Sequence, residues 1–307
     1  MRIFVAGGTG TLGRPVVRGL VQAGHEVRAL ARTAERAAPL RALGAEPVVV
    51  DLFDASAVQE AAAGSEAILH LATRIPPLAR MRRRRAWRDN DRLRNQGASI
   101  LVNAAIAVRA RVYVQESVTF LYQDLGDTWL YETAPIDPAW PLASARDAER
   151  EAARFSARGG EGVVLRFGGF YAPYAPSTLQ ALGLARWGLF PIVGGGDRYV
   201  SSIHVDDAAA GVVAALGVPG GIYNVCDDEP VTLDAYAAAL ADAFGFRRPW
   251  HVSPGLARLL LGPAVQVLTR SQRVANTMFK AVSGWAPRYP SVREGWRAVA
   301  AALAVPA

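Results

Sequence analysis

Three glycines near the start of the chain have a spacing that could cradle a phosphate. Gly7, Gly10 and Gly13 follow the apolar run Arg2–Ala6, and the segment Pro15–Gly24 that comes next opens at a proline and ends at a glycine. A strand, a glycine loop and a helix in this order let the N–H groups of the helix N-terminus contact a pyrophosphate. The spacing G-x-x-G-x-x-G is one residue wider at its first gap than the usual dinucleotide fingerprint, and the alternative is a glycine-rich turn that binds nothing. The predicted phosphate-binding residues are Gly7, Gly10, Thr11, Leu12 and Gly13.

The ends of the following apolar runs carry residues that could select and hold this dinucleotide. The run Glu26–Arg32 ends in an arginine without an acid, and Arg36 lies one helical turn further on. An acid there would bind the ribose 2′-hydroxyl of NAD, whereas an arginine would accept the 2′-phosphate of NADP, so the sequence favours NADP. NAD stays open, because an arginine can also stack on the adenine. The further predicted contacts are Arg32 at the 2′-phosphate, Asp51 and Leu52 at the adenine, and Leu71, Ala72 and Thr73 along the ribose and pyrophosphate.

Short apolar runs alternate with helix-like segments along the first half of the chain. This alternation indicates parallel strands joined by helices that cover both faces of a sheet, with ligands at the carboxyl ends of the strands. We therefore expect an α/β fold. The expected strands are 2–6, 26–32, 47–51, 67–72, 112–117 and 162–167, and the expected helices include 15–24, 54–63, 95–109 and 144–158.

The basic residues are concentrated in one segment, which bears on the class of partner. The 307-residue chain has a net charge of +7, and the segment Arg74–Arg94, with nine arginines against Asp89 and Asp91, accounts for all of it. These arginines could hold a phosphate or carboxylate bidentately, or could form a solvated loop and helix start. Trp87 is the one aromatic residue among them and no nucleic-acid motif is recognisable, so we expect no nucleic-acid partner.

The composition also bears on compartment and metal binding. Cys226 is the single cysteine, which excludes an intrachain disulfide and is typical of a reducing cytoplasm. The first expected strand begins at Arg2, so no secretory or transit segment is expected. The apolar stretch 256–268 is interrupted by Arg258 and Pro263 and is too short for a bilayer. Because no His, Cys and carboxylate cluster has metal-ligand spacing, we expect a cytoplasmic protein without a metal or a membrane partner.

The combined motifs resemble the short-chain dehydrogenase/reductase superfamily in its extended or atypical, NAD(P)-dependent epimerase/dehydratase-like branch. The resemblance rests on the loop 7–13, the strand ends 51–52 and 70–72, and the segments 165–173, 203–208 and 284–288. It implies a Rossmann-type doubly wound parallel sheet with a smaller, mostly C-terminal substrate-binding domain. It marks His204 and Asp206 as part of a common structural segment. The implied dinucleotide-binding domain comprises residues 1–169 and the returning segment 200–226, and the implied substrate-binding domain comprises residues 170–199 and 227–307.

The chain differs from this family at the catalytic residues. Extended members use a Ser or Thr after the fifth strand, then a Tyr and a Lys four residues apart on the next long helix. In that pair the Lys lowers the pKa of the Tyr, which can then exchange a proton near neutral pH. The matching positions hold Val118, with Ser117 just before it, and then Pro141 and Ala145, and the sequence contains no Tyr-x-x-x-Lys. The usual proton relay is therefore missing.

Three functions remain open. The first is an NADP-dependent oxidoreductase acting on a small, largely apolar organic substrate, in which another group handles the proton. The second is a non-redox enzyme for cyclisation, elimination or isomerisation of a natural-product intermediate, because a dry pocket can act by orientation alone. The third is a non-catalytic NAD(P)-binding redox sensor. In each case we expect a monomer or a homodimer. The candidate catalytic residues are Ser117, Tyr122 and Tyr171, with Tyr174 considered beside them; Glu116 is considered too, but a structural role is favoured for it.

Overall fold

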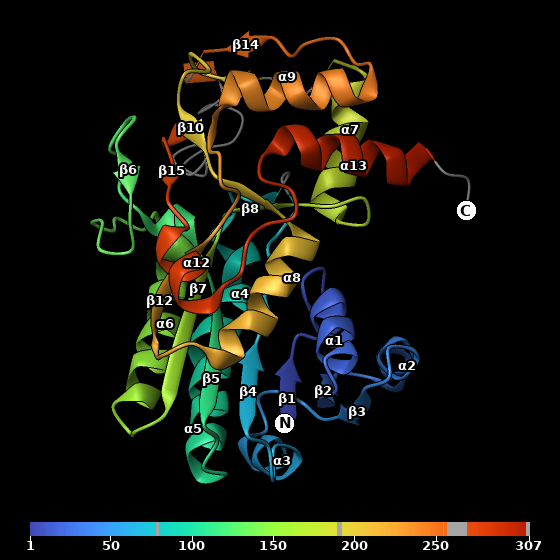
Figure 1. Ribbon diagram of the computed structural model, residues 1–307, viewed down its shortest axis with the longest axis vertical. Helices are drawn as coiled ribbons and strands as arrows, with labels where there is room; N and C mark the ends of the chain where they lie inside the picture. Colours follow the sequence, from blue (N-terminus) through green and yellow to red (C-terminus); the bar gives the residue numbers. More distant parts are fainter. Residues whose placement is uncertain (78–79, 189–191, 254, 257–268, 305–307) are drawn as a thin grey trace.

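A parallel sheet forms the centre of the structure. The computed structural model describes residues 1–307 except for 78–79, 189–191, 254, 257–268 and 305–307. Within these residues, seven parallel strands form one sheet in the order β3-β2-β1-β4-β5-β7-β12 (Figure 1). The order reverses between β1 and β4, and ligands bind beyond the carboxyl ends of the strands at such a switch point. The strands are β1 (Arg2–Ala6), β2 (Glu26–Ala31), β3 (Glu46–Val49), β4 (Ala67–His70), β5 (Val112–Val118), β7 (Glu161–Phe167) and β12 (Gly221–Val225).

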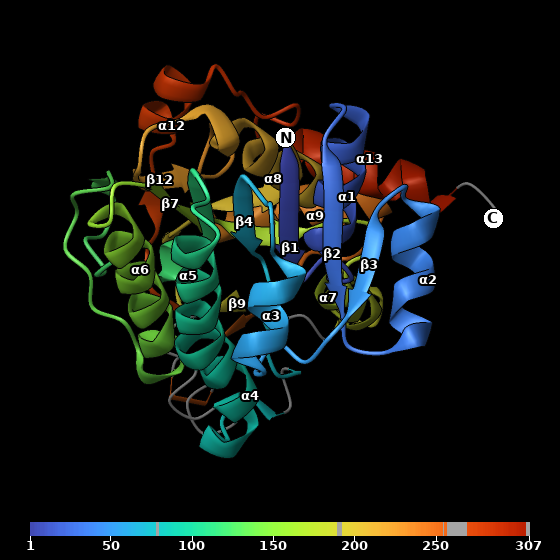
Figure 2. The ribbon, with the colours of Figure 1, turned by 90° about the horizontal axis from the view of Figure 1, so that it is seen from below.

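Helices cover both faces of this sheet, because its strands bury apolar side chains on alternate sides. Ile3 and Val5 of β1 pack in the core under α1, α2 and α8, whereas Phe4 packs in the core under α3, α5 and α6. Figure 2 shows α3, α5 and α6 on one side of the strands and α8 on the other. The helices of the two layers are α1 (Gly13–Gln22), α2 (Ala34–Ala42), α3 (Ala55–Ala61), α5 (Ala98–Ala107), α6 (Ala143–Ser156) and α8 (Val205–Ala214).

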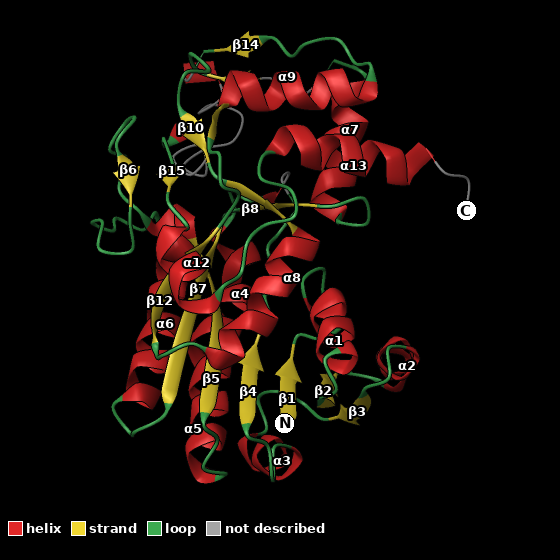
Figure 3. Cartoon of the chain, in the orientation of Figure 1, coloured by secondary structure: helices red, strands yellow, loops and turns green. Residues whose placement is uncertain are grey.

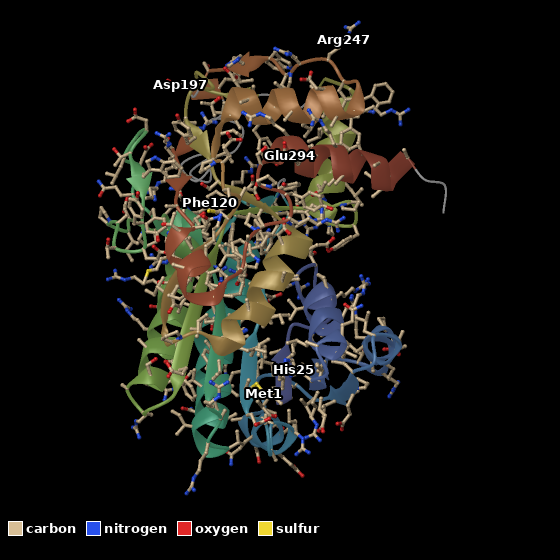
Figure 4. The ribbon with its side chains drawn as sticks, in the orientation of Figure 1. Met1, His25, Phe120, Asp197, Arg247 and Glu294 are labelled. Atoms are coloured by element: carbon tan, nitrogen blue, oxygen red, sulfur yellow. The ribbon has the colours of Figure 1, made fainter. Side chains whose placement is uncertain are left out.

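A further group of elements lies beyond the carboxyl ends of the strands (Figures 1 and 3). Leu240 of α9 and Trp296 of α13 form a core there with Tyr171 of β8. In Figure 4, Phe120 lies near the carboxyl ends of the strands, where this group of elements meets the sheet, whereas Met1 lies at the opposite end of the sheet. The remaining elements are α4 (Arg88–Arg92), β6 (Trp129–Leu130), β8 (Gly169–Tyr171), α7 (Pro176–Arg186), β9 (Ile192–Val193), β10 (Tyr199–Val200), β11 (Ser202–His204), β13 (Val231–Thr232), α9 (Leu233–Phe244), β14 (His251–Val252), β15 (Arg273–Val274), α12 (Thr277–Ser283) and α13 (Val292–Ala304).

The expected fold class and the order of strands and helices are confirmed. The main local difference is the helix expected from residue 95, which starts as a π-helical turn over Leu93–Gly97 and continues as α5. Among the described residues, no helix is both long enough and apolar enough to cross a bilayer, and the stretch 257–268 lies outside them. The domain boundaries at residues 169, 199 and 226 stay a prediction.

Candidate dinucleotide and substrate site

The glycine loop forms a tightly packed cradle at the end of β1. Gly7 has a φ of +96°, and a Cβ there would lie 2.5 Å from the Ala72 nitrogen, while a Cβ on Gly13 would lie 2.0 Å from the Gly7 oxygen. A side chain at either position would therefore push the loop out of place. In the part of the chain that the structure describes, no side chain caps α1 and its first turn has no acid. Its N–H groups and its positive dipole end fit the pyrophosphate of a dinucleotide.

A cavity of about 840 Å³ lies directly beyond this loop. It brings together ten of the eleven residues predicted to bind the dinucleotide, from the ends of β1, β2, β3 and β4. The exception is Gly13, which supports the loop through its contact with Gly7. Sequence analysis did not single out several other residues that line the cavity. These are Ala6, Thr9, Leu30, Phe53, Ile75, Leu93, Phe170, Pro176 and Ser177.

Two arginines line the cavity beyond the end of β2. Arg32 follows the last residue of β2, and Arg36 lies in the first turn of α2. The Thr33 side chain accepts a hydrogen bond from the Arg36 N–H and thereby caps α2. This cap fixes the short connection between the two arginines. The cavity therefore carries two positive charges at the position where the sequence predicts a 2′-phosphate.

The basic segment 74–94 contributes one wall of the same cavity. The Arg92 guanidinium lies 3.6 Å from the centroid of the Phe53 ring, and Arg74 pairs with Asp89 at 2.9 Å. The arginines between positions 80 and 88 are exposed. The exposed arginines match the interpretation as a solvated segment, whereas anion binding by Arg74 and Arg92 stays a prediction. Sequence analysis missed Phe53, although its position directly after Asp51 and Leu52 at a strand end was an available signal.

His70, at the end of β4, forms hydrogen bonds that connect the cavity wall with the π-helical turn beginning at Leu93. Its Nδ1 accepts the Ala72 N–H at 3.3 Å, and its Nε2 lies 3.0 Å from the Leu93 carbonyl oxygen. These partners assign the proton to Nε2. Burial lowers the pKa of His70 to about 4; the hydrogen bond to Leu93 opposes this shift and the charge of Arg94 adds to it. A neutral His70 thus holds Ala72 and Leu93 at the cavity wall.

A buried ion pair lies where β5 meets the cavity. Glu116 lines the cavity although only 5% of its surface is exposed, and its Oε2 lies 3.4 Å from Nη2 of the fully buried Arg94. Nε and Nη1 of Arg94 have no hydrogen-bond partner among the described residues. Burial raises the pKa of Glu116, and the positive charge of Arg94 opposes that rise. The pair therefore places an acid with a raised pKa at the cavity wall.

The candidate residues Ser117 and Tyr122 belong to a different network, outside the residues that line the cavity. The Ser117 hydroxyl donates to Glu149 at 2.6 Å, and Glu149 accepts two bonds from Arg166 at 2.8 and 2.7 Å. The Arg166 guanidinium lies 4.9 Å from the centroid of the Tyr122 ring, and the Tyr122 hydroxyl donates to Asn224 at 2.7 Å. Burial raises the pKa of Tyr122. Both hydroxyls therefore already serve contacts inside the protein.

The two candidate tyrosines of the substrate side have separate environments. Tyr171 lines a smaller cavity of about 80 Å³, which shares Phe170 and Ser177 with the large one. Burial raises the pKa of the Tyr171 hydroxyl. Tyr174 is 44% exposed, and its hydroxyl donates to the Asp206 carboxylate at 2.8 Å. The structure therefore brings neither hydroxyl together with Ser117 or Tyr122.

The positions that hold the family's Tyr and Lys carry apolar side chains here. Pro141 and Ala145 are buried, and Ala145 packs in a core cluster with Leu121. His204 has the structural place that the resemblance implies, because its Nδ1 accepts the Asp206 N–H and caps α8. Among the described residues, no group of three or more His, Cys, Asp or Glu side chains could hold a metal ion.

Comparisons with known proteins agree with this geometry. The NAD dependent epimerase/dehydratase family matches residues 3–226 of the chain. A Streptomyces protein named 3-diazoavenalumate denitrifying reductase is 36% identical over 308 residues, which cover 96% of this chain and 99% of that protein. A ketoreductase from Stigmatella aurantiaca, named for 4-hydroxy-2-methyl-3-oxo-4-farnesyl-3,4-dihydroquinoline-1-oxide, is 30% identical over 80% of this chain and 74% of its own length.

Among solved structures, the human epimerase family protein SDR39U1 with NADPH matches with a TM-score of 0.78 and 20% identity, over 98% of this chain and 99% of that chain. At this identity the likeness shows the fold alone. The chain therefore belongs to the NAD dependent epimerase/dehydratase family, and it is an NAD(P)-dependent oxidoreductase or epimerase-like enzyme of the atypical short-chain dehydrogenase/reductase branch.

Proposed function

We propose that the protein is an NADPH-dependent reductase of a small, largely apolar organic acceptor. The observation that carries the proposal is a single cavity with a phosphate cradle and Arg32 at one end and Glu116 and Phe170 at the other. Arg32 follows β2 and Glu116 lies on β5, three strand spacings apart in the sheet order or roughly 15 Å. A dinucleotide crosses the strand ends over such a distance. When bound, it would supply a hydride at the Glu116 end of the cavity.

The preference for NADP over NAD rests on Arg32 and Arg36. Both line the cavity beyond β2, where an NAD-selective site would carry an acid. A planar guanidinium binds a phosphate through two parallel hydrogen bonds, so this pair suits the 2′-phosphate. The human structure named above contains NADPH, whereas other similar structures contain NAD, so the preference rests on the two arginines.

The Streptomyces relative suggests the chemistry of the acceptor. Its name describes reduction of a diazo compound with loss of nitrogen. Such a reduction adds one hydride and one proton and releases N₂, according to R=N₂ + H⁻ + H⁺ → RH₂ + N₂. Because this acceptor has no carbonyl oxygen to protonate, the missing Tyr and Lys are no obstacle to it. We therefore place a diazo-substituted carboxylate first and, from the second relative, a ketone second.

The test begins with fluorescence titrations of nucleotide-free protein with NADPH and NADH. We expect NADPH to bind about tenfold or more tightly, which equals a difference of about 1.4 kcal/mol. NADPH consumption is then followed with an α-diazocarboxylate ester, with a β-keto ester and with no acceptor, and released N₂ is measured by mass spectrometry. One N₂ per NADPH supports diazo reduction, and an alcohol product supports ketone reduction. Equal affinities would remove the 2′-phosphate argument, and substrate conversion without NADPH consumption would favour the non-redox alternative.

The proposal extends to organisation and compartment. We assign the substrate side to residues 170–199 and 227–307, and we place the enzyme in the cytoplasm as a monomer or homodimer. Cys226 is a buried free thiol whose pKa is raised by burial, as expected of an unreactive cysteine in a reducing compartment. Light scattering distinguishes the two oligomeric states, and fractionation of the producing cells tests the compartment.

A further inference from the structure

Of the described residues that line the large cavity, three are acidic, and they differ in position. Asp51 lies beyond β3, on the adenine side of the switch point. Asp89 lies on the arginine-rich wall, where it pairs with Arg74 at 2.9 Å. Glu116 lies on β5, on the side where Phe170 also lines the cavity. Glu116 is therefore the acid on the substrate side of the sheet.

The polar groups around Glu116 are incompletely paired. Its contact with Arg94 is a single one of 3.4 Å, and two guanidinium nitrogens of Arg94 have no partner in the described chain. The amide nitrogen of Asn90, one helical turn before Arg94, is likewise buried without a partner there. Buried polar groups are nearly always hydrogen-bonded, so each exception calls for a water or a ligand. The π-helical turn that carries Arg94 is also a feature found frequently at functional sites.

We propose that Glu116 is the proton donor of the reduction, with Arg94 as its positioning residue. This inference rests on the proposed function. The O–H bond of Glu116 breaks and its proton becomes one new hydrogen of the product, on carbon for a diazo acceptor or on oxygen for a ketone. The hydride supplies the other hydrogen and the electron pair, and with a diazo acceptor the C–N bond breaks as N₂ leaves. The carboxylate that remains lies beside Arg94 and regains a proton from solvent through the cavity.

The ionisation of Glu116 depends on groups from several elements. Arg94 lies next to it, His70 on the neighbouring β4 is neutral, and Arg166 on β7 is bound to Glu149 in the network that also holds Ser117. Burial is the main cause of the raised pKa of Glu116 and Arg94 opposes it, so removal of Arg94 should raise this pKa further. The other charged residues that line the cavity are Arg32, Arg36, Asp51, Arg74, Asp89 and Arg92.

A binding experiment tests Glu116 without any substrate. NADP⁺ carries a positive charge on its nicotinamide ring and NADPH does not, whereas both carry the same 2′-phosphate. Ionised Glu116 beside the nicotinamide would therefore favour NADP⁺ over NADPH. We expect the ratio of the two affinities to rise with pH by up to about tenfold per pH unit while Glu116 ionises, which is the slope for release of one proton.

Three variants make this experiment decisive. Glu116→Gln should bind both nucleotides with a ratio that does not change with pH. Glu149→Gln, which removes the other buried carboxylate that faces an arginine, is the matched control and should keep the wild-type slope. Arg94→Met should move the midpoint of the pH dependence of the affinity ratio to higher pH. This variant tests the proposal even if Glu116→Gln fails to fold.

The outcomes separate this inference from the proposed function. If wild type binds neither nucleotide, both are overturned. Suppose instead that both nucleotides bind and that the ratio of their affinities does not change with pH, or changes as steeply in Glu116→Gln as in wild type. Glu116 is then not beside the nicotinamide, and only this inference is overturned.

Turnover then tests the chemical role. With the α-diazocarboxylate ester or the β-keto ester, each of which takes up one proton besides the hydride, Glu116→Gln should lower kcat about 100-fold, the usual size of a general-acid effect, while KM changes little. The wild-type fall of kcat/KM at high pH should disappear in the variant. Glu116→Asp should restore part of the rate and the pH dependence, and an unchanged kcat in Glu116→Gln would overturn the assignment.

Discussion

Two buried arginine–glutamate pairs lie at β5, and they differ in how many of their hydrogen-bonding groups have partners. One pair includes Glu116 of this strand, and the other accepts a hydrogen bond from its neighbour Ser117. In the core pair, Arg166 donates two bonds of 2.7 and 2.8 Å to Glu149, which also accepts the Ser117 hydroxyl. In the cavity pair, Arg94 makes one contact of 3.4 Å with Glu116, and two of its nitrogens have no partner within the described ranges.

The difference shows how one strand serves both stability and chemistry. Successive residues of a strand point to opposite faces of the sheet. Ser117 therefore points to the helix α6 that carries Glu149, whereas Glu116 points to the cavity. The core network leaves one buried nitrogen without a partner, Nη1 of Arg166, whereas the cavity pair leaves two nitrogens of Arg94 and holds its carboxylate by one long contact, so it leaves more hydrogen-bonding groups for a ligand. We therefore expect loss of the core pair to act on stability and loss of the cavity pair to act on function.

The largest expected effect on stability comes from breaking the core pair. Glu149→Gln should lower the free energy of unfolding by about 3 kcal/mol, because Arg166 would remain as a buried charge without its partner. Glu116→Gln likewise leaves a buried arginine without its carboxylate, but it breaks one contact of 3.4 Å instead of two short bonds, so we expect a smaller loss. Urea unfolding of both variants at neutral pH measures the two losses. Equal losses would remove the distinction between the pairs.

Acid should destabilise the protein through His70, which supports the cavity side. The folded-state pKa of His70 is about 4 and its ordinary value is 6.5, so the unfolded chain binds more protons between these values. The stability is fully present above pH 6.5 and falls as the pH drops to about 4, by about 3 kcal/mol in total. Urea unfolding from pH 7 to pH 4 measures this slope, which His70→Gln should flatten.

Glu116 should act in the opposite direction over part of the same pH range. Its folded-state pKa lies above its ordinary value, so the stability it contributes is present below the ordinary pKa and is lost as the pH rises through the folded-state pKa. Stability should therefore rise more steeply with pH in Glu116→Gln than in wild type. An identical slope in the two proteins would mean that Glu116 has the same pKa in the folded and unfolded chains.

At the other end of the cavity, Arg32→Ala should weaken NADPH binding about 30-fold, or about 2 kcal/mol, which is the range for a hydrogen bond to a charged group. Binding of NADH should change little, because NADH lacks the 2′-phosphate. Arg41→Ala, also on α2 but outside the residues that line the cavity, is the control. Fluorescence titration gives the affinities, and equal losses for the two nucleotides would contradict the assignment of NADP.

The smallest expected effect concerns Tyr122. Tyr122→Phe removes the hydrogen bond to Asn224 at 2.7 Å and should lower the free energy of unfolding by about 1 kcal/mol. Turnover per folded molecule should stay unchanged, because the Tyr122 hydroxyl is bound to Asn224 and Tyr122 does not line the cavity. A large loss of turnover would show that this hydroxyl reaches the substrate in a state other than the one described.

Local patterns predicted that the residues at the ends of β1, β2, β3 and β4 lie together, because the carboxyl ends of parallel strands meet at one edge of the sheet; their contacts with a dinucleotide stay a prediction. Gly7, Arg32, Asp51 and Ala72 each follow an apolar run, and parallel strands bring their carboxyl ends to one edge. The substrate half was less predictable. Its residues come from the segment 74–94 and from β8 and α7, where neither spacing nor composition indicates which side chains meet.

The sequence by itself determined the α/β fold, the glycine cradle and the absence of a Tyr–Lys pair, because each of these depends on residues close together in the chain. Only the tertiary structure decided that Arg94 of an otherwise exposed basic segment is buried against Glu116, and that Tyr122 joins Asn224, 102 positions away. The physical reason is that burial and charge pairing depend on contacts between distant segments. Adjacent positions such as Glu116 and Ser117 acquire different roles only when the sheet assigns them opposite faces.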